Sequence, residues 1–157
     1  MEEMLALLKQ KGWTIGSCES LTAGLFTSTL ASISGASAVL KGGIVAYQSE
    51  VKARVVNVDD ALIQTYGVIS APCAKQMAIQ ARELLGCDIC VSFTGNAGPD
   101  VMEGKPVGCV YCAIADANGA ETYHLQFAGS RNEVRAQAVA RMCEEVVAWL
   151  MKHEGDL

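Results

Sequence analysis

The stretch WTIGSCESLTAG, from Trp13 to Gly24, joins an apolar segment to a turn rich in hydroxyl groups. The residues that follow carry leucines at helical spacing, Leu21, Leu25 and Leu30. This succession predicts a strand, a polar turn and a helix. The turn places the Ser20 side chain beside backbone N–H groups at a helix N-terminus, where negative charge is stabilised. Ser20 is therefore a candidate acyl-transfer nucleophile, although serines before helices commonly serve as N-caps.

The same patterns predict alternating helices and strands along the rest of the chain. We expect helices at about 2–11, 21–32, 49–56 and 70–85, a short helix capped by Asp59 or Asp60 and ended by Gly67, and a final helix at 131–152. Strands are expected at 13–18, 38–47, 88–94, 107–115 and 120–127, the last two joined by a hairpin turn at Asn118-Gly119. The predicted fold is a three-layer α/β/α domain over residues 1–157. Its sheet is mixed and mostly parallel, and a C-terminal β-hairpin is followed by a helix.

Composition narrows the class of protein. The 157 residues are 51% hydrophobic and carry a net charge of −5 with no cluster of basic residues, which disfavours nucleic-acid binding. The acidic start and the absence of an apolar run of about 20 residues disfavour a signal peptide and a membrane span. We expect a cytoplasmic protein without a membrane partner.

The seven cysteines include two C-x-x-C pairs, Cys87/Cys90 and Cys109/Cys112, at a spacing that zinc sites use. Alternating apolar residues around each pair predict strands, on which residues three apart point to opposite faces. We therefore expect no metal site and treat the cysteines as small buried apolar groups.

Three polar loops at the carboxyl ends of predicted strands, 18–24, 47–52 and 94–106, are expected to form the ligand crevice. In the second loop, Lys52 can act as a base if burial lowers its pKa. Two alternatives stay open: Ser49 as nucleophile in the S-x-x-K pattern it forms with Lys52, and a triad that uses His124. The third loop, rich in glycine, offers N–H donors for a phosphate or an oxyanion.

Five segments in order resemble the C-terminal domain of the competence/damage-inducible CinA family. They are E-S-x-T-x-G (19–24), G-G-x-V-A-Y with E-V-K (42–52), T-G-x-A-G-P (94–99), K-P-V-G-x-V-Y (105–111) and F-x-G-x-R (127–131). The chain departs from the family pattern at Leu21, Ala23, Gln48, Ser49 and Asn96, and at residues 100–104, where a glycine run is replaced.

The resemblance implies a nicotinamide-nucleotide amidase, which hydrolyses nicotinamide mononucleotide to nicotinate mononucleotide and ammonia. By that resemblance Ser20 is the nucleophile, Lys52 the base and Tyr47 a further catalytic residue. The family motifs assign substrate contacts to Thr22, Gly24, Gly43, Thr94, Gly95, Lys105 and Arg131, the last two toward the phosphate. The resemblance also implies a nucleotide as partner, a homo-oligomer and chemistry without a metal or cofactor.

In the implied mechanism, Ser20 attacks the carboxamide carbon, neutral Lys52 accepts its proton, and N–H groups at the start of helix 21–32 stabilise the oxyanion. The altered loops leave two other functions open. One is a nucleotide-binding or interaction module that has lost catalysis, and the other is a serine amidase for a different small amide.

Overall fold

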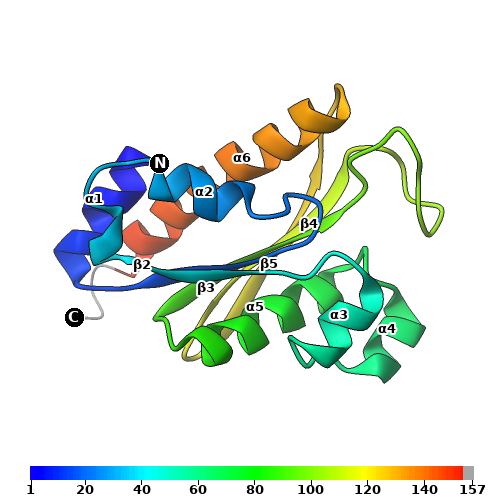
Figure 1. Cartoon of the computed structure of the whole chain (residues 1–157), viewed down its shortest axis with the longest axis horizontal. Helices are drawn as coiled ribbons and strands as arrows, with labels where there is room; N and C mark the ends of the chain where they lie inside the picture. The colour runs from blue at the N-terminus through cyan, green and yellow to red at the C-terminus, as the bar shows by residue number, and fades with distance from the viewer. Residues whose placement is uncertain (154–157) are drawn as a thin grey trace.

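The computed structural model describes residues 1–153 and contains one five-stranded sheet with helices on both faces (Figure 1). Its strands are β1 (Ile15–Glu19), β2 (Leu40–Val45), β3 (Ile89–Gly95), β4 (Cys109–Asp116) and β5 (Gly119–Gln126). Its helices are α1 (Glu2–Lys11), α2 (Leu25–Ala31), α3 (Ser49–Arg54), α4 (Asp60–Tyr66), α5 (Ala71–Leu85) and α6 (Arg131–Lys152), with a short 3₁₀ turn, η1 (Ala36–Ala38).

The strands lie in the order β2-β1-β3-β4-β5. Strand β1 pairs in parallel with β2 and β3, β4 runs antiparallel to β3, and β5 returns antiparallel to β4. Four of the five strands therefore point the same way, as the predicted mixed, mostly parallel sheet requires. The carboxyl ends of β1, β2 and β3 meet at one edge of the sheet, so the loops that follow them lie together there.

Apolar cores on both faces of the sheet hold the layers together. Helices α1, α2 and α6 cover one face, while α3, α4 and α5 lie on the other (Figure 1). On the first face Phe26 of α2 packs against Phe93 of β3, with ring centroids 5.5 Å apart. On the second face Met77 of α5 packs into a cluster with Cys18 and Cys90. The predicted three-layer α/β/α architecture is confirmed.

Local capping explains where several helices begin. Asp59 accepts a hydrogen bond from the Ala61 N–H at 2.9 Å, and Ser70 accepts one from the Cys73 N–H at 3.3 Å, so α4 and α5 start where the sequence predicts. Helix α6 occupies the predicted residues 131–152 and opens with a reciprocal capping box between Ser130 and Glu133.

The second helix differs from its prediction. It begins at Leu25 and not at residue 21, and residues 21–24 form a turn. Within that turn the Ala23 N–H donates to the Ser20 carbonyl at 3.0 Å, and Gly24 adopts a left-handed conformation with φ of 97°. The turn is stable because Glu19, at the end of β1, supplies the cap of the helix.

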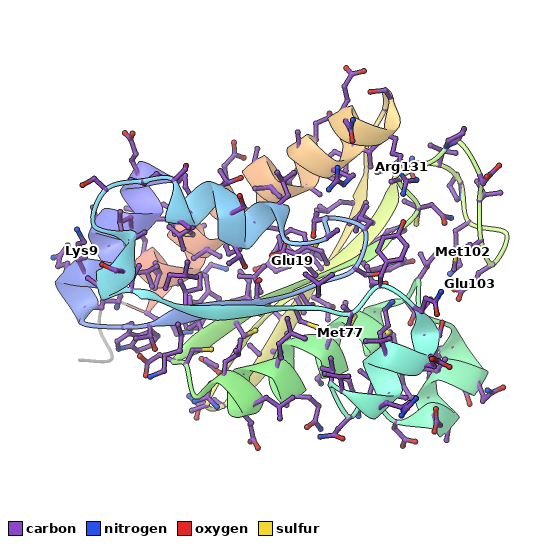
Figure 2. All side chains as sticks on the ribbon, in the orientation of Figure 1. Lys9, Glu19, Met77, Met102, Glu103 and Arg131 are labelled. Atoms are coloured by element: carbon purple, nitrogen blue, oxygen red, sulfur yellow. The ribbon has the colours of Figure 1, made fainter. Side chains whose placement is uncertain are left out.

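Glu19, labelled in Figure 2, is 1% exposed, and its carboxylate accepts hydrogen bonds on both oxygens. Oε1 accepts from the Phe26 N–H at 2.8 Å, and Oε2 accepts from the Thr27 N–H at 3.1 Å. Oε2 also accepts from the Ser17 and Thr27 hydroxyls, at 2.8 and 2.9 Å. A carboxylate at a helix N-terminus is favoured by the helix dipole as well as by these bonds. Glu19 therefore ties β1 to α2 and fixes the turn between them.

We expect Glu19→Gln to lower the free energy of unfolding by about 1–3 kcal/mol. Each carboxylate oxygen receives one backbone N–H, so either orientation of the amide points its NH₂ group at a backbone donor. Urea unfolding followed by circular dichroism measures the loss, and Glu83→Gln, an exposed carboxylate on α5, is the matched control. Equal midpoints for the two variants would contradict this account of Glu19.

Candidate active site

The carboxyl edge of the sheet brings Ser20 and Lys52 together. Ser20 directly follows β1, and its backbone N–H donates to the Phe93 carbonyl of β3 at 2.9 Å, which holds it at the sheet edge. Lys52 comes from α3, after the neighbouring strand β2. Its Nζ donates to Ser20 Oγ at 2.9 Å and to the Tyr47 carbonyl at 3.0 Å. The distance between the hydroxyl and the amine suits direct proton transfer.

Burial sets the protonation of Lys52. The residue is 1% exposed, and loss of hydration lowers the pKa of its amine below the ordinary value. The nearby Cys73, Cys18 and Glu103 act in the opposite direction with smaller effect. A lysine with a lowered pKa supplies the neutral amine that a base requires.

The turn after Ser20 supplies candidate oxyanion donors. Within residues 1–153, the backbone N–H groups of Leu21 and Thr22 have no hydrogen-bond acceptor. The N–H of Ser20 is bound to Phe93, and those of Phe26 and Thr27 are bound to Glu19. The predicted donors therefore lie in the turn before α2 and not at the first residues of the helix, because Glu19 already occupies the latter.

Arg135 of α6 anchors this turn from behind, a role that the sequence did not reveal. Its Nε donates to the Leu21 carbonyl at 2.8 Å and its Nη2 to the Thr22 carbonyl at 3.0 Å. Nη1 reaches Asn132 at 3.0 Å. The two carbonyls lie more than 110 positions away in the chain.

A pocket of about 340 Å³ opens beside Ser20 and Lys52. Among the predicted site residues, the pocket is lined by Ser20, Lys52, Tyr47, Thr94, Gly95 and Arg131. Its further walls come from Leu21, Gln48, Ser49, Val68, Ile69, Asn96, Ala97, Gly98, Asp100 and Met102. The volume is at the lower end of the usual range for small-molecule sites, about 300–1,000 Å³.

Four predicted contact residues do not line this pocket. Thr22 is fully buried, and among the described residues its hydroxyl has no hydrogen-bond partner. Gly24 caps α2. Gly43 packs against the hydroxyls of Ser17 and Thr27, which leave no room for a side chain. Lys105 donates to the Ile69 carbonyl at 3.2 Å. These positions support the walls of the site, because their side chains or backbone are used in packing.

Arg131, labelled in Figure 2, and Tyr47 both line the pocket and are bonded to each other. Arg131 Nη2 donates to the Tyr47 hydroxyl and Nη1 to the Gly98 carbonyl, both at 2.7 Å. The Tyr47 ring is half-exposed, whereas its carbonyl accepts from Lys52 and, at 3.3 Å, from Ser20 Oγ. Tyr47 therefore orients the nucleophile and base through its backbone, and its phenol is held by Arg131.

The alternative sites are separate from this arrangement or less well placed. Ser49 lines the pocket, but the Lys52 amine is bonded to Ser20. His124 on β5 stacks on Tyr111 with ring centroids 4.3 Å apart and does not line the pocket.

The two cysteine pairs differ. Cys87 and Cys90 lie in the same core cluster, so the prediction of opposite faces was wrong for this pair, because Cys87 precedes β3 and is not a strand residue. Cys109 and Cys112 pack into the cores on opposite faces of the sheet, as the strand prediction required. Within residues 1–153, no three His, Cys, Asp or Glu side chains are grouped as a metal site would need.

A larger hollow of about 580 Å³ lies elsewhere, between α1, α2 and α6. Its walls are mostly apolar, and burial raises the pKa of its one thiol, Cys143, to about 11. It lacks a paired nucleophile and base among the described residues, so the smaller pocket is the better candidate for chemistry.

Within residues 1–153, no helix has the length and apolar character needed to cross a membrane.

Comparison with known proteins identifies the family to which the chain is similar. The family described as "CinA C-terminal domain" matches residues 1–150. A competence-damage inducible protein of Streptococcus gordonii is 48% identical over 134 residues, which are 85% of this chain and 32% of that protein. One from Geobacillus kaustophilus is 43% identical over 140 residues, 88% of this chain and 34% of that protein. The chain thus spans about a third of the length of these relatives.

Solved structures show the same fold. A CinA superfamily protein from Klebsiella pneumoniae 700603 superposes with a TM-score of 0.94 at 28% identity, covering 96% of this chain and 94% of that one. Together with the family match over nearly the whole sequence, this likeness shows that the chain belongs to the CinA C-terminal domain family.

Proposed function

We propose that this protein is an amidohydrolase that converts nicotinamide mononucleotide to nicotinate mononucleotide and ammonia. The observation that carries the proposal is the contact of 2.9 Å between the buried Lys52 amine and Ser20 Oγ at the wall of a pocket of about 340 Å³. A serine beside a lysine of lowered pKa is a nucleophile–base pair suited to amide hydrolysis. The family resemblance of the motifs supports the choice of substrate.

In the proposed reaction, Ser20 Oγ attacks the carboxamide carbon while neutral Lys52 accepts the hydroxyl proton. The negative charge on the carbonyl oxygen is stabilised by the free N–H group of Leu21, the residue of the turn that lines the pocket beside Ser20. Lys52 then gives its proton to the departing ammonia, and an acyl-enzyme remains on Ser20. Water attacks this ester, Lys52 accepts a proton from the water, and the proton returns to Ser20 as the acid leaves.

The turn is suited to bind an oxyanion because its carbonyl groups already accept hydrogen bonds, which hold its peptide groups in place. Arg135 binds the Leu21 and Thr22 carbonyls, and the Ser20 carbonyl accepts from the Ala23 N–H. In a trans peptide group the N–H points opposite to the carbonyl, so fixing the carbonyl also fixes the direction of the donor. Donors that are oriented before the reaction need no rearrangement in the transition state.

We expect Ser20→Ala to lower the rate of ammonia release by at least about a thousandfold, since removal of a nucleophile abolishes the covalent route. Its melting temperature should stay close to that of the wild type. Ser49→Ala is the matched control and should retain most activity. An inactive Ser49 variant beside an active Ser20 variant would reassign the nucleophile. If the wild type binds the mononucleotide and releases no ammonia, the protein is a binding module.

The rate should rise with pH through the lowered pKa of Lys52, because only the neutral amine accepts a proton. Lys52→Arg should be inactive because its guanidinium stays protonated. Lys52→Met should also be inactive but at least as stable as the wild type at neutral pH.

The sign of this stability effect follows from linkage. The pKa of Lys52 in the folded state lies below its value in the unfolded state. Burial of the charged amine therefore lowers the stability of the folded state most at pH values below the folded-state pKa, and this loss disappears as the pH approaches about 10.5. Methionine removes that loss. Thermal unfolding of both proteins across pH measures the difference, and a large loss of stability in Lys52→Met would contradict the assignment of a buried lysine kept for chemistry.

In this proposal Arg131, which lines the pocket, binds the phosphate of the mononucleotide. Arg131→Ala should lower kcat/KM for nicotinamide mononucleotide roughly ten- to hundredfold and should lower kcat/KM for nicotinamide riboside, which has no phosphate, much less. Tyr47→Phe removes the hydroxyl that Arg131 binds and keeps the cation, so it should retain the preference for the phosphate. Equal losses on both substrates in Arg131→Ala would show that the residue only supports the mouth of the pocket.

A further inference from the structure

The loop between β3 and β4 closes on itself through one side chain, that of Asn96. Asn96 Nδ2 donates to the carbonyls of Met102 and Lys105, at 3.1 and 3.0 Å, and its Oδ1 accepts from the Met102 N–H at 3.1 Å. Asn96 is 3% exposed. The Asn96 amide therefore links the beginning of the loop to its end, and Met102 and Asp100 of this loop line the pocket.

Glu103 then fastens this closed loop to the opposite wall. Its two carboxylate oxygens accept from the backbone N–H groups of Val68 and Ile69, at 2.9 and 3.0 Å. Lys105 adds a bond to the Ile69 carbonyl, and Thr94 Oγ1 donates to the Val68 carbonyl at 2.7 Å. The backbone at Gly67 passes so close to the Glu103 carboxylate that a β-carbon there would collide with it. Two segments 35 residues apart thus meet through a charged, bidentate contact.

This contact joins two sides of the pocket beside the nucleophile. Val68 and Ile69 form one side of the pocket, and Asp100 and Met102 form another. Met102 and Glu103 stand together at the open end of the sheet, across the pocket from Arg131 (Figure 2). Because Glu103 joins the two sides, release of its carboxylate would let the loop move away and enlarge the space.

We propose that Glu103 is a latch that holds loop 96–105 against residues 68–69 and thereby limits the pocket to ligands of about one nucleotide. Glu103 is a specificity-determining residue that acts through the position of Met102 and Asp100. The proposal rests on the proposed amidase function for its substrate, while the latch itself can be tested without turnover.

The same carboxylate also acts on the base. Charged and titratable groups near Lys52 come from three elements: Cys18 of β1, Cys73 of α5 and Glu103 of the loop. Asp100 and Arg131 line the same pocket. Burial raises the pKa of Cys18 to about 12 and that of Cys73 to about 11, so both thiols are neutral near pH 7. The carboxylate of Glu103 therefore favours protonated Lys52, and its removal should shift the acid limb of the rate profile to lower pH.

The first experiment measures the latch directly. Hydrogen exchange of the Val68 and Ile69 amides is followed by NMR in the wild type, Glu103→Gln and the exposed control Glu83→Gln. In Glu103→Gln one of the two amides must face an NH₂ group, so exchange at both should accelerate roughly ten- to hundredfold, while the control stays as wild type. Unchanged exchange in Glu103→Gln would overturn the proposal, whether or not the protein is an enzyme.

The second experiment measures specificity. Ammonia release is compared for nicotinamide mononucleotide and for the bulkier nicotinamide adenine dinucleotide. The ratio of their kcat/KM values should fall roughly tenfold in Glu103→Gln, with most of the loss in KM for the mononucleotide. Glu103→Asp keeps the charge but is too short to span both amides. It should lose discrimination without moving the acid limb, whereas Glu103→Gln should do both.

These outcomes separate the two proposals. A wild type that releases ammonia from neither compound refutes the amidase function and leaves the latch to be judged by exchange. Accelerated exchange with an unchanged substrate ratio in an active enzyme would overturn the role of Glu103 in specificity. A pH profile shifted equally in Glu103→Gln and Glu103→Asp would overturn its electrostatic effect on Lys52.

Discussion

The carboxylate of Glu19 sets the geometry on which the rest of the site depends. It is buried at the end of the central strand β1 and binds two backbone N–H groups of α2. Because these donors are satisfied by a side chain, the helix starts five residues after Ser20 and the chain between them forms a tight turn. That turn holds the serine at the sheet edge and leaves the Leu21 and Thr22 N–H groups free within the described structure. A helix that began directly after Ser20 would use its first N–H groups differently.

Beside this turn the protein buries the side chain of Lys52, where loss of hydration disfavours the charged form of its amine. Lys52 would be more stably accommodated in water, and its pKa is lowered as a result. Among the described residues the amine makes two hydrogen bonds, to Ser20 Oγ and to the Tyr47 carbonyl, and both suit a neutral amine as well as an ammonium. A residue kept at the expense of stability, beside a hydroxyl and facing a pocket, is typical of a functional site.

Most polar contacts around the pocket join a side chain to a backbone group in a distant segment of the chain. Arg135 binds the turn after β1, Arg131 joins α6 to the loops after β2 and β3, and Glu103 joins the loop after β3 to residues 68–69. Loops are rigid when their backbone groups are satisfied in this way, and they can then present side chains at fixed positions. The departures from the family pattern at Asn96 and residues 100–104 fit this scheme, since Asn96, Met102 and Glu103 build a closed wall in place of a flexible glycine run.

The sequence by itself determined the order of elements, the mixed sheet and the pairing of Ser20 with Lys52 through motif resemblance, because periodicity, caps and local motifs are properties of neighbouring residues. The cap at Ser70, the hairpin turn at Asn118-Gly119 and the full extent of α6 follow from such local signals. The tertiary structure alone decided the roles of Glu19, Arg135 and Glu103. Arg135 and Glu103 bind backbone groups that are far away in the chain, and Glu19 binds N–H groups of a helix that the sequence predicted to begin four residues earlier. Backbone groups are the same in every residue, so the sequence does not show which of them a side chain will bind. The tertiary structure also decided that Thr22, Gly24, Gly43 and Lys105 support the pocket without lining it, since their orientation depends on what packs against them.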